Sequence, residues 1–324
     1  MPKKGFEYAY YEGIAQEMRR DSSVILFYEY QSPVATYGTL KPINLDVEFG
    51  KPRVNYSGID ESWYRGVAIG ATRAGCRPIT VIPSMAETVA FHTVNEGAKL
   101  HCGGGADEIT PCVIVQETSA QGVGGGQSHS DYDCDSFYMH CTNLITLNPA
   151  TAYDAKGLMI AAIRDDNMVV YIKGGNTRMI ADEVPDDPYT VPIGKAAIRT
   201  EGKDITIVSS GHGVATCTPA VAALQKEGIS VEFIDLRTLA PLDRETLVKS
   251  VRKTGKLLTV DQSPYTLCPG AEVMATCAEG CPGAKFKRIA FPDTCPMSAP
   301  ELIAYQLPND KEVVKAAKML LATK

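Results

Sequence analysis

Hydrophobic and polar positions in the first half of the chain form short apolar runs that alternate with amphipathic stretches. Residues 6–18 carry apolar side chains at helical spacing, whereas 24–28 is a continuous apolar run typical of a buried strand. Further strands are predicted at 78–83, 112–116, 144–148 and 168–173, and further helices at 87–100 and 152–164. Strands that alternate with helices predict a parallel sheet covered on both faces, which is an α/β fold.

A second α/β unit is predicted in the rest of the chain. Residues 181–194 are acidic, rich in proline and aperiodic, which is typical of a linker. Beyond them, strands are predicted at 204–209, 230–235, 256–261 and 285–290, and helices at 215–227, 243–254, 270–278 and 310–321. We therefore expect two parallel-sheet domains, 1–186 and 187–324. Residues 31–54, which are rich in turn formers, are expected to be an irregular loop.

Composition narrows the class of protein. The 324 residues are 44% hydrophobic and 22% charged, as in ordinary globular proteins, and the formal net charge of −6 argues against nucleic acid as a partner. No apolar run approaches the roughly 20 residues of a membrane span, and no secretion signal precedes the first helix. A cytoplasmic protein without a membrane partner is the expectation.

Ten cysteines raise the alternatives of buried thiols and a metal site. No C-x-x-C pair occurs, and the closest cysteines are Cys277 and Cys281. Without a secretion signal, reduced and mostly buried thiols are the expected state. A metal site built from Cys268, Cys277, Cys281 and Cys295 is the alternative.

Two adjacent acids, Asp60 and Glu61, precede a stretch of small residues that ends at Gly75. Close helical spacing of the glycines and alanines at 66–74 predicts a helix that packs near a neighbour. Ser57 or Asp60 is suited to cap its N-terminus, where an acid also complements the helix dipole. A carboxylate at this place is either a cap or a working acid, and spacing alone favours the cap.

Two further residues are candidates for chemistry. Glu29 follows the strand at 24–28, and the carboxyl end of an early strand is where α/β proteins place ligand-facing groups. His129 lies in the glycine-rich segment 122–130 after a strand, a position suited to an acid or base. The glycines do not form the G-x-G-x-x-G pattern, so a dinucleotide site is not indicated.

Several strings resemble one protein family. They are Gly228-Ile-Ser-Val-Glu-Phe-Ile-Asp-Leu-Arg-Thr-Leu-Ala-Pro-Leu-Asp243, Lys253-Thr-Gly-Lys-Leu-Leu-Thr-Val-Asp261, Ala152-Tyr-Asp-Ala-Lys-Gly-Leu158 and Ala162-Ile-Arg-Asp-Asp-Asn167. They resemble the transketolase superfamily, and most of all the beta subunit of the first component of 2-oxo acid dehydrogenase complexes. The resemblance covers about residues 6 to 320. It implies a pyrimidine-binding domain followed by a transketolase C-terminal domain.

The resemblance implies thiamine diphosphate as cofactor. Glu61 matches the glutamate that bonds the aminopyrimidine ring, which requires a protonated carboxyl with a raised pKa. Glu29 matches an acid near the cofactor and the subunit contact, and His129 matches a histidine that handles protons on the substrate. Met85 stands in the segment where relatives have an aromatic that stacks on the ring, and a thioether suits the same contact.

The resemblance also implies a cation and a partner. Val113, Ala162, Asp165 and Asn167 match positions that hold a monovalent cation such as K⁺ in many relatives. The chain lacks the family's Gly-Asp-Gly…Asn pattern for Mg²⁺ and diphosphate. A separate alpha subunit is therefore expected to supply that half of the site, in a heterotetramer with two copies of each chain. A lipoylated acyltransferase is a further possible partner.

Departures from the family surround the substrate side of the cofactor. They are Tyr28 and Tyr30 around the first acid, Tyr56-Ser-Gly-Ile59 before the helix, Met85, and Phe91 with His92 on the next helix. The implied activity is decarboxylation or cleavage of a 2-oxo acid or related dicarbonyl, with transfer of the acyl fragment to an acceptor such as lipoamide. Two alternatives stay open: a transketolase-like or carbon–carbon-cleaving enzyme without a lipoyl acceptor, and a non-catalytic subunit that keeps the fold.

Overall fold

The computed structural model describes residues 1–29, 32–56, 58, 60, 63–83, 93, 97–103, 109–118, 135–174, 181–295, 297 and 299–323. The chain divides into two compact units, which are described separately. Unit 1 contains Met1–Thr118 and Phe137–Ile193, and unit 2 contains Ser119–Ser136 and Gly194–Lys324. The predicted helix at 87–100 and the candidates Glu61, Met85 and His129 lie outside the described residues.

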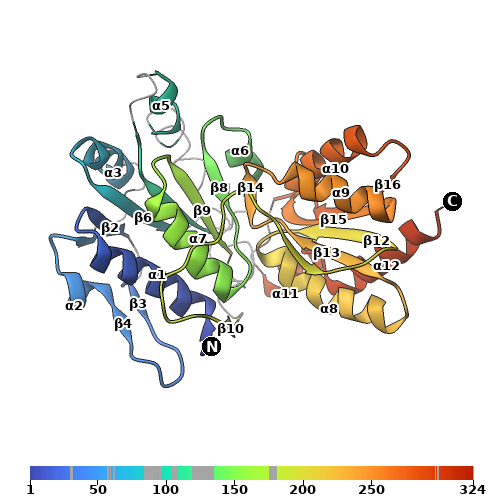
Figure 1. Ribbon diagram of the computed structural model, residues 1–324, viewed down its shortest axis with the longest axis horizontal. Coiled ribbons are helices and arrows are strands. Elements are labelled where there is room, and N and C mark those ends of the chain that lie inside the picture. Colours follow the sequence, from blue (N-terminus) through green and yellow to red (C-terminus); the bar gives the residue numbers. More distant parts are fainter. Residues whose placement is uncertain are drawn as a thin grey trace. The chain divides into compact units, whose positions relative to one another are not determined.

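Unit 1 is built on a parallel sheet (Figure 1). Its strands run in the order β8-β9-β7-β6-β2-β5, and every neighbouring pair is parallel. The elements of this part of the chain are β1 (Lys3–Gly5), α1 (Phe6–Arg20), β2 (Val24–Tyr28), β3 (Val34–Ala35), β4 (Ile43–Asn44), α2 (Leu45–Phe49), β5 (Val54–Tyr56), α3 (Trp63–Arg73), β6 (Arg77–Pro83), α5 (Leu100–Gly103), β7 (Val113–Thr118), α6 (Asp135–Met139), β8 (Ile145–Leu147), α7 (Ala152–Arg164), β9 (Val169–Gly174) and β10 (Ala181–Glu183). The parallel sheet confirms the predicted α/β class.

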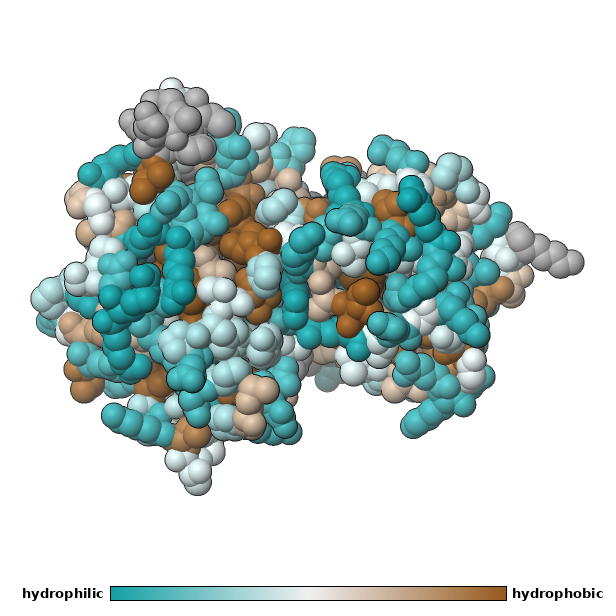
Figure 2. Space-filling view, in the orientation of Figure 1, coloured by the Kyte–Doolittle hydropathy of each residue, from teal (hydrophilic) through white to brown (hydrophobic). Residues whose placement is uncertain are grey.

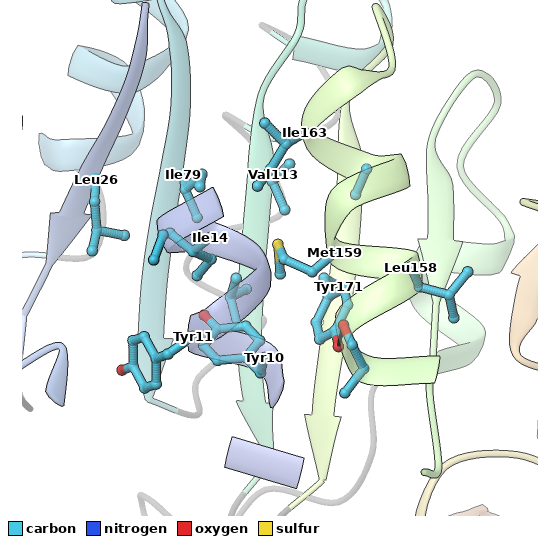
Figure 3. Packing of buried hydrophobic residues seen from close by; sticks show 14 of the residues in the cluster. Tyr10, Tyr11, Ile14, Leu26, Ile79, Val113, Leu158, Met159, Ile163 and Tyr171 are labelled. Atoms are coloured by element: carbon cyan, nitrogen blue, oxygen red, sulfur yellow. Dashed lines mark hydrogen bonds between the residues drawn. The ribbon is translucent and has the colours of Figure 1, made fainter. Parts of the chain in front are cut away.

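The core of unit 1 lies between this sheet and the helices α1 and α7, which pack against each other (Figure 3). Ile14 of α1 and Met159 of α7 point toward Ile79 and Val113 on the strands, and all four are at most 2% exposed. The helices approach closely at Gly13, where a Cβ atom would lie 3.2 Å from a backbone oxygen of α7. Burial of each such aliphatic side chain stabilises the fold by about 1.5–3 kcal/mol.

Residues 31–54 are not the irregular loop that the turn-rich composition predicts, because β3, β4, α2 and the start of β5 lie in this stretch. The Asn44 side chain caps α2 by accepting from the Val47 N–H at 3.1 Å. β5 joins the sheet beside β2, with Val54 opposite Leu26. Elements of two to five residues are too short to show a hydrophobic period, which explains the wrong prediction.

The segment predicted as a linker packs against unit 1. β10 pairs antiparallel with β1, and Tyr189 stacks on Tyr153 with the ring centroids 4.6 Å apart. The Val191 N–H donates to the Gly157 carbonyl at 3.1 Å, and a Cβ atom at Gly157 would come within 2.5 Å of Val191. Apolar side chains thus hold this otherwise acidic, proline-rich segment against unit 1. We call residues 181–193 the strap.

A buried lysine fastens the strap to the helices. Lys156 of α7 has a fully buried side chain and donates to the Pro185 and Asp186 carbonyls at 2.7 and 3.0 Å. Its third hydrogen bond reaches the Glu12 carboxylate of α1 at 2.9 Å, which also binds Lys4 at 2.7 Å. Burial lowers the pKa of Lys156, and the bond to Glu12 counteracts this effect. All three donors of the ammonium group are satisfied, which burial of a charge requires.

Unit 2 is a second sheet with helices on both faces: α8 and α12 pack together on one face, and α9 and α10 on the other (Figure 1). The strand order is β11-β13-β12-β15-β16, parallel except for the pair β11–β13. Its elements are β11 (Ala197–Thr200), β12 (Ile205–Ser209), α8 (His212–Lys226), β13 (Val231–Asp235), β14 (Thr238–Ala240), α9 (Arg244–Thr254), β15 (Lys256–Pro264), α10 (Pro269–Gly280), β16 (Lys285–Phe291), α11 (Pro300–Gln306) and α12 (Asp310–Leu321). The strands and helices predicted for this half are all present.

The surface and the thiols complete the description. Among the described residues, no helix is long and apolar enough to span a membrane. On the face drawn in Figure 2, hydrophilic residues surround separate apolar patches. The cysteines that are described are free thiols, most of them buried, and no group of three or more metal-binding side chains occurs in the described part of the chain. The four cysteines of the alternative metal site are all described and form no such group, so that site is not assembled.

Candidate functional site

The carboxyl ends of the parallel strands of unit 1 meet at one edge of the sheet. Tyr28, the last residue of β2, pairs with Val81 of β6, and Glu117 near the end of β7 pairs with Lys173 of β9. In parallel α/β sheets, ligands bind outside this edge. The edge therefore defines the candidate site, and the described residues around it can be compared with the sequence predictions.

Glu29 lies at this edge, directly after β2, and is only 2% exposed. Beside it, the Tyr28 hydroxyl donates to Asp46 at 3.1 Å, and the Tyr28 ring lies 5.6 Å from the ring of Tyr56 at the end of β5. Burial, followed by the Asp46 charge, raises the pKa of Tyr28. The edge thus carries one buried acid, Glu29, directly after a residue whose ring pairs with that of Tyr56.

The N-terminus of α3 carries a side-chain cap. The Asp60 side chain accepts a hydrogen bond from the Trp63 N–H at 2.9 Å, in agreement with the prediction that Ser57 or Asp60 is the cap. The helix ends at Arg73, two residues before Gly75, which has a φ of 84° in the left-handed region common after helix ends. Asp60 thus has the capping role that the sequence favours for an acid at this place.

A buried ion-pair cluster, which was not predicted from the sequence, lies at the same edge. Lys173 is fully buried and contacts the carboxylates of Glu117 at 2.5 Å and Glu7 at 2.9 Å. Burial alone lowers the pKa of Lys173, but the two carboxylates outweigh it and raise the pKa above its usual value. The lysine also lies 4.8 Å from the centre of the Tyr10 ring. The sequence does contain a signal for this ion pair. Each of two buried strands has a charged residue near its end: Glu117 in Val-Ile-Val-Gln-Glu and Lys173 in Val-Val-Tyr-Ile-Lys.

A second missed residue is Arg65 in the first turn of α3. It is fully buried, on the same helix face as Ala68 and Thr72. An arginine keeps its charge at all accessible pH values, so burial on this face requires compensating contacts. In the sequence Arg65 stands four residues after Glu61. At this spacing, opposite charges on a helix can pair, so the spacing was a signal for Arg65.

The four residues suggested for a monovalent cation come together at the opposite edge of the sheet. Val113 begins β7 and pairs with Val169, two residues after Asn167. Asp165 caps the end of α7, where its N–H donates to the Ala162 carbonyl at 3.3 Å, and its carboxylate accepts from the Asn167 N–H at 2.8 Å. One turn therefore holds three of these residues beside the start of β7.

Arg77 shares this turn. Its guanidinium donates to the carbonyl oxygens of Ile163 and Asp165 at 3.1 and 3.0 Å and forms an ion pair with Asp166 at 2.5 Å. The Asp165 carbonyl thus has one lone pair engaged by a cationic side chain.

Comparison with known proteins identifies the family. Residues 4–176 match the family described as "Transketolase, pyrimidine binding domain" and residues 194–313 match "Transketolase, C-terminal domain". The 2-oxoisovalerate dehydrogenase subunit beta of Bacillus subtilis is 34% identical over 318 residues, which cover 94% of each chain. The chain belongs to the family of 2-oxo acid dehydrogenase beta subunits.

Other members of this beta-subunit family are similarly close. The pyruvate dehydrogenase E1 component subunit beta of Dictyostelium discoideum is 34% identical and covers 94% of this chain and 87% of its own length. The acetoin:2,6-dichlorophenolindophenol oxidoreductase subunit beta of Bacillus subtilis is 32% identical and covers 96% and 95%. A solved structure entitled "Split gene transketolase, inactive beta4 tetramer" has a TM-score of 0.78 at 21% identity over 98% of both chains, which shows the fold alone.

Proposed function

We propose that this chain is the beta subunit of a thiamine diphosphate-dependent enzyme that decarboxylates or cleaves a 2-oxo acid or related dicarbonyl. The observation that carries the proposal is the match over 94% of both this chain and a 2-oxo acid dehydrogenase beta subunit, which includes both domains. The acyl fragment then passes to an acceptor such as lipoamide. Relatives whose names give different substrates have nearly equal sequence identity to this chain. Sequence identity therefore does not select the substrate.

The described residues fit the pyrimidine half of this cofactor. Glu29 supports this assignment with a buried carboxyl at the carboxyl edge of the sheet. In the proposal, Glu61 holds a proton at the aminopyrimidine ring and Met85 contacts the ring face. When bound, the cofactor supplies a carbon nucleophile that adds to the substrate carbonyl.

His129 and the partner subunit complete the proposed site. His129 handles protons on the substrate or acyl acceptor, a task suited to a side chain that titrates near neutral pH. An alpha subunit supplies the diphosphate and Mg²⁺ half, in an α₂β₂ heterotetramer. Gly66 and Gly70 of α3 support a helix-packing interface, because a Cβ atom at either would meet no atom within 4 Å among the described residues outside this helix. We further propose K⁺ at Val113, Ala162, Asp165 and Asn167.

Amide substitution of the two adjacent acids tests the proposal. With the co-expressed alpha subunit, we expect Glu61→Gln to lower 2-oxo acid-dependent reduction of an artificial electron acceptor by about 10²–10⁴-fold, because the amide cannot hold the ring proton. Asp60→Asn is the matched control, since asparagine caps a helix as well as aspartate and should retain turnover. Full activity in Glu61→Gln at unchanged stability would refute the role assigned to this residue.

The choice of substrate and acceptor separates the enzymatic alternatives. Pyruvate, a branched-chain 2-oxo acid and acetoin should be compared, each with a lipoylated acceptor domain and with a free aldehyde. Turnover that requires the aldehyde would favour the transketolase-like reaction. Calorimetry that detects no thiamine diphosphate binding by the assembled enzyme would favour a non-catalytic subunit.

A further inference from the structure

A groove of about 390 Å³ lies between strand β16 and helix α12 in unit 2. Three basic side chains line it, Lys287, Arg288 and Lys315, against a single acidic one, Glu312. The protein as a whole carries a formal net charge of −6, so the groove is a local reversal of the average charge. Such a concentration of positive charge in a concave place attracts anions.

The charges of the groove are not neutralised by carboxylates, as those of some other basic side chains of unit 2 are. Arg199, Arg244 and Lys318 each form an ion pair, at 2.6, 2.6 and 2.7 Å from a carboxylate. Among the described residues, no ion pair is formed by Lys287, Arg288 or Lys315. The one acid in the groove, Glu312, does not provide such an ion pair. Its carboxylate accepts from the Asn309 N–H at 3.2 Å in the capping box of α12.

Arg288 is held in position by groups that do not cancel its charge. Its guanidinium lies 3.8 Å from the centre of the Tyr265 ring, and Nη1 lies 3.8 Å from the Cys268 sulfur. Burial raises the pKa of the Cys268 thiol to about 12, so the thiol is neutral. The Nε atom of Arg288 is buried without a hydrogen-bond partner. A guanidinium that neutral groups hold in place keeps its full charge toward an oxyanion in the groove.

The strand edge adds backbone donors. β16 is the last strand of its sheet, and the Lys285 N–H donates to the Gly255 carbonyl on the β15 side at 2.9 Å. In a parallel strand, the backbone N–H groups of successive residues point alternately to the two sides. The N–H of Lys285 points toward β15, so the N–H of Arg288 points to the open edge. Backbone N–H groups beside cationic side chains are the usual donors in phosphate sites.

The length of the groove favours a small molecule over a peptide strand. Glu312 and Met319, which line it on α12, stand seven residues apart, and a helix rises only about 10 Å over that distance. A typical added strand of five to six residues needs about 17–20 Å. Lysines on a strand edge also commonly prevent pairing with other strands, which is the simplest structural role for these charges.

We propose that the groove between β16 and α12 binds a small molecule that carries a phosphate or diphosphate group. Lys287 and Lys315 supply the charge from the strand and the helix. Arg288 supplies a fixed fork of donors, and the strand edge supplies the backbone N–H.

Calorimetric titration of inorganic pyrophosphate into the full-length chain, in the assembly in which it purifies, tests the proposal. The double variant Lys287→Glu/Lys315→Glu should weaken binding by at least about tenfold, since both cationic contacts become repulsive. The matched control is Lys285→Glu/Lys311→Glu, which makes the same change of charge on the same strand and helix outside the groove. It should bind within about twofold of the unchanged protein, with equal thermal stability in both variants.

Three results would overturn the proposal. Pyrophosphate binding that is absent at millimolar concentration, or equally weakened in both double variants, would leave the groove without a phosphate role. Equal binding of sulfate and pyrophosphate that disappears at physiological salt would assign the charges to protection of the strand edge. Tighter binding of an oligoglutamate peptide than of pyrophosphate would assign the groove to an acidic protein segment.

Discussion

Replacement of Lys173 by methionine is expected to destabilise unit 1 by about 3 kcal/mol. The lysine side chain is fully buried, between the carboxylates of Glu117 and Glu7 at 2.5 and 2.9 Å. Removal of one partner from a buried ion pair costs about 3–5 kcal/mol, because the remaining charge stays desolvated. The lower end applies here, since Glu7 is 28% exposed and water can reach it.

The dependence on pH follows from the raised pKa of Lys173. Burial lowers this pKa, but Glu117 and Glu7 outweigh burial and hold it above the unfolded value of 10.5. A raised folded pKa contributes stability that is fully present below the unfolded value and is lost as pH rises through the folded pKa. The difference in stability between the unchanged protein and Lys173→Met should therefore be the same at pH 7 and pH 9.

Tryptophan fluorescence in urea provides the assay. Trp63 is the one tryptophan of the chain and lies in α3 of unit 1, so its emission reports unit 1. With a denaturant slope of about 2–3 kcal/mol/M, a loss of 3 kcal/mol moves the midpoint by about 1–1.5 M. Lys51→Met, an exposed control in the same unit, should change stability by less than about 0.5 kcal/mol.

The partner acid supplies a second test of the same reasoning. Adding Glu117→Gln to Lys173→Met should recover part of the loss, because it removes one of the two uncompensated carboxylates. If Lys173→Met moved the midpoint no further than Lys51→Met, the buried charge would not be stabilising unit 1 and the argument would be refuted.

Three further substitutions have expected outcomes. Asp60→Ala should cost about 1 kcal/mol in the same urea assay, because the Trp63 N–H loses its acceptor, whereas Asp60→Asn should not. Gly157→Ala should cost about 1–3 kcal/mol and expose the strap to protease, because the new Cβ would lie 2.5 Å from Val191; equal protease resistance would contradict this contact. Burial lowers the pKa of His212 from 6.5 to about 4, so stability should fall by up to about 3 kcal/mol as pH drops from 6.5 to 4, and His212→Gln should lack that part of the pH dependence.

The first and last residues of elements with strong local signals could be predicted from the sequence. β2 at Val24–Tyr28, α7 at Ala152–Arg164 and α12 at Asp310–Leu321 have the predicted bounds. α7 begins where the Thr151 side chain accepts from the Asp154 N–H, and α12 begins at a capping box. Apolar periodicity and capping residues are local, so they can be read without knowledge of the fold.

Long-range partners could not be predicted in this way. β1 and β10 are three-residue strands that pair only because Lys3 and Glu183 meet across the folded unit. The same holds for the site edge, where Lys173 is visible in the sequence but its partner Glu7 lies 166 residues away. A charge at the end of a buried strand indicates that a partner must exist, since an unpaired buried charge is too costly, but not which residue it is.

The acids Asp60 and Glu61 show how a structural finding changes the weight of a sequence alternative. From spacing alone, an acid at the start of α3 is more readily a cap than a catalyst, since most helices need caps and few acids are catalytic. The hydrogen bond from the Trp63 N–H to Asp60 at 2.9 Å supplies that cap. With a cap identified at Asp60, the role proposed for Glu61 in chemistry becomes separately testable. Loss of turnover in Glu61→Gln together with loss of stability in Asp60→Ala would separate the two tasks.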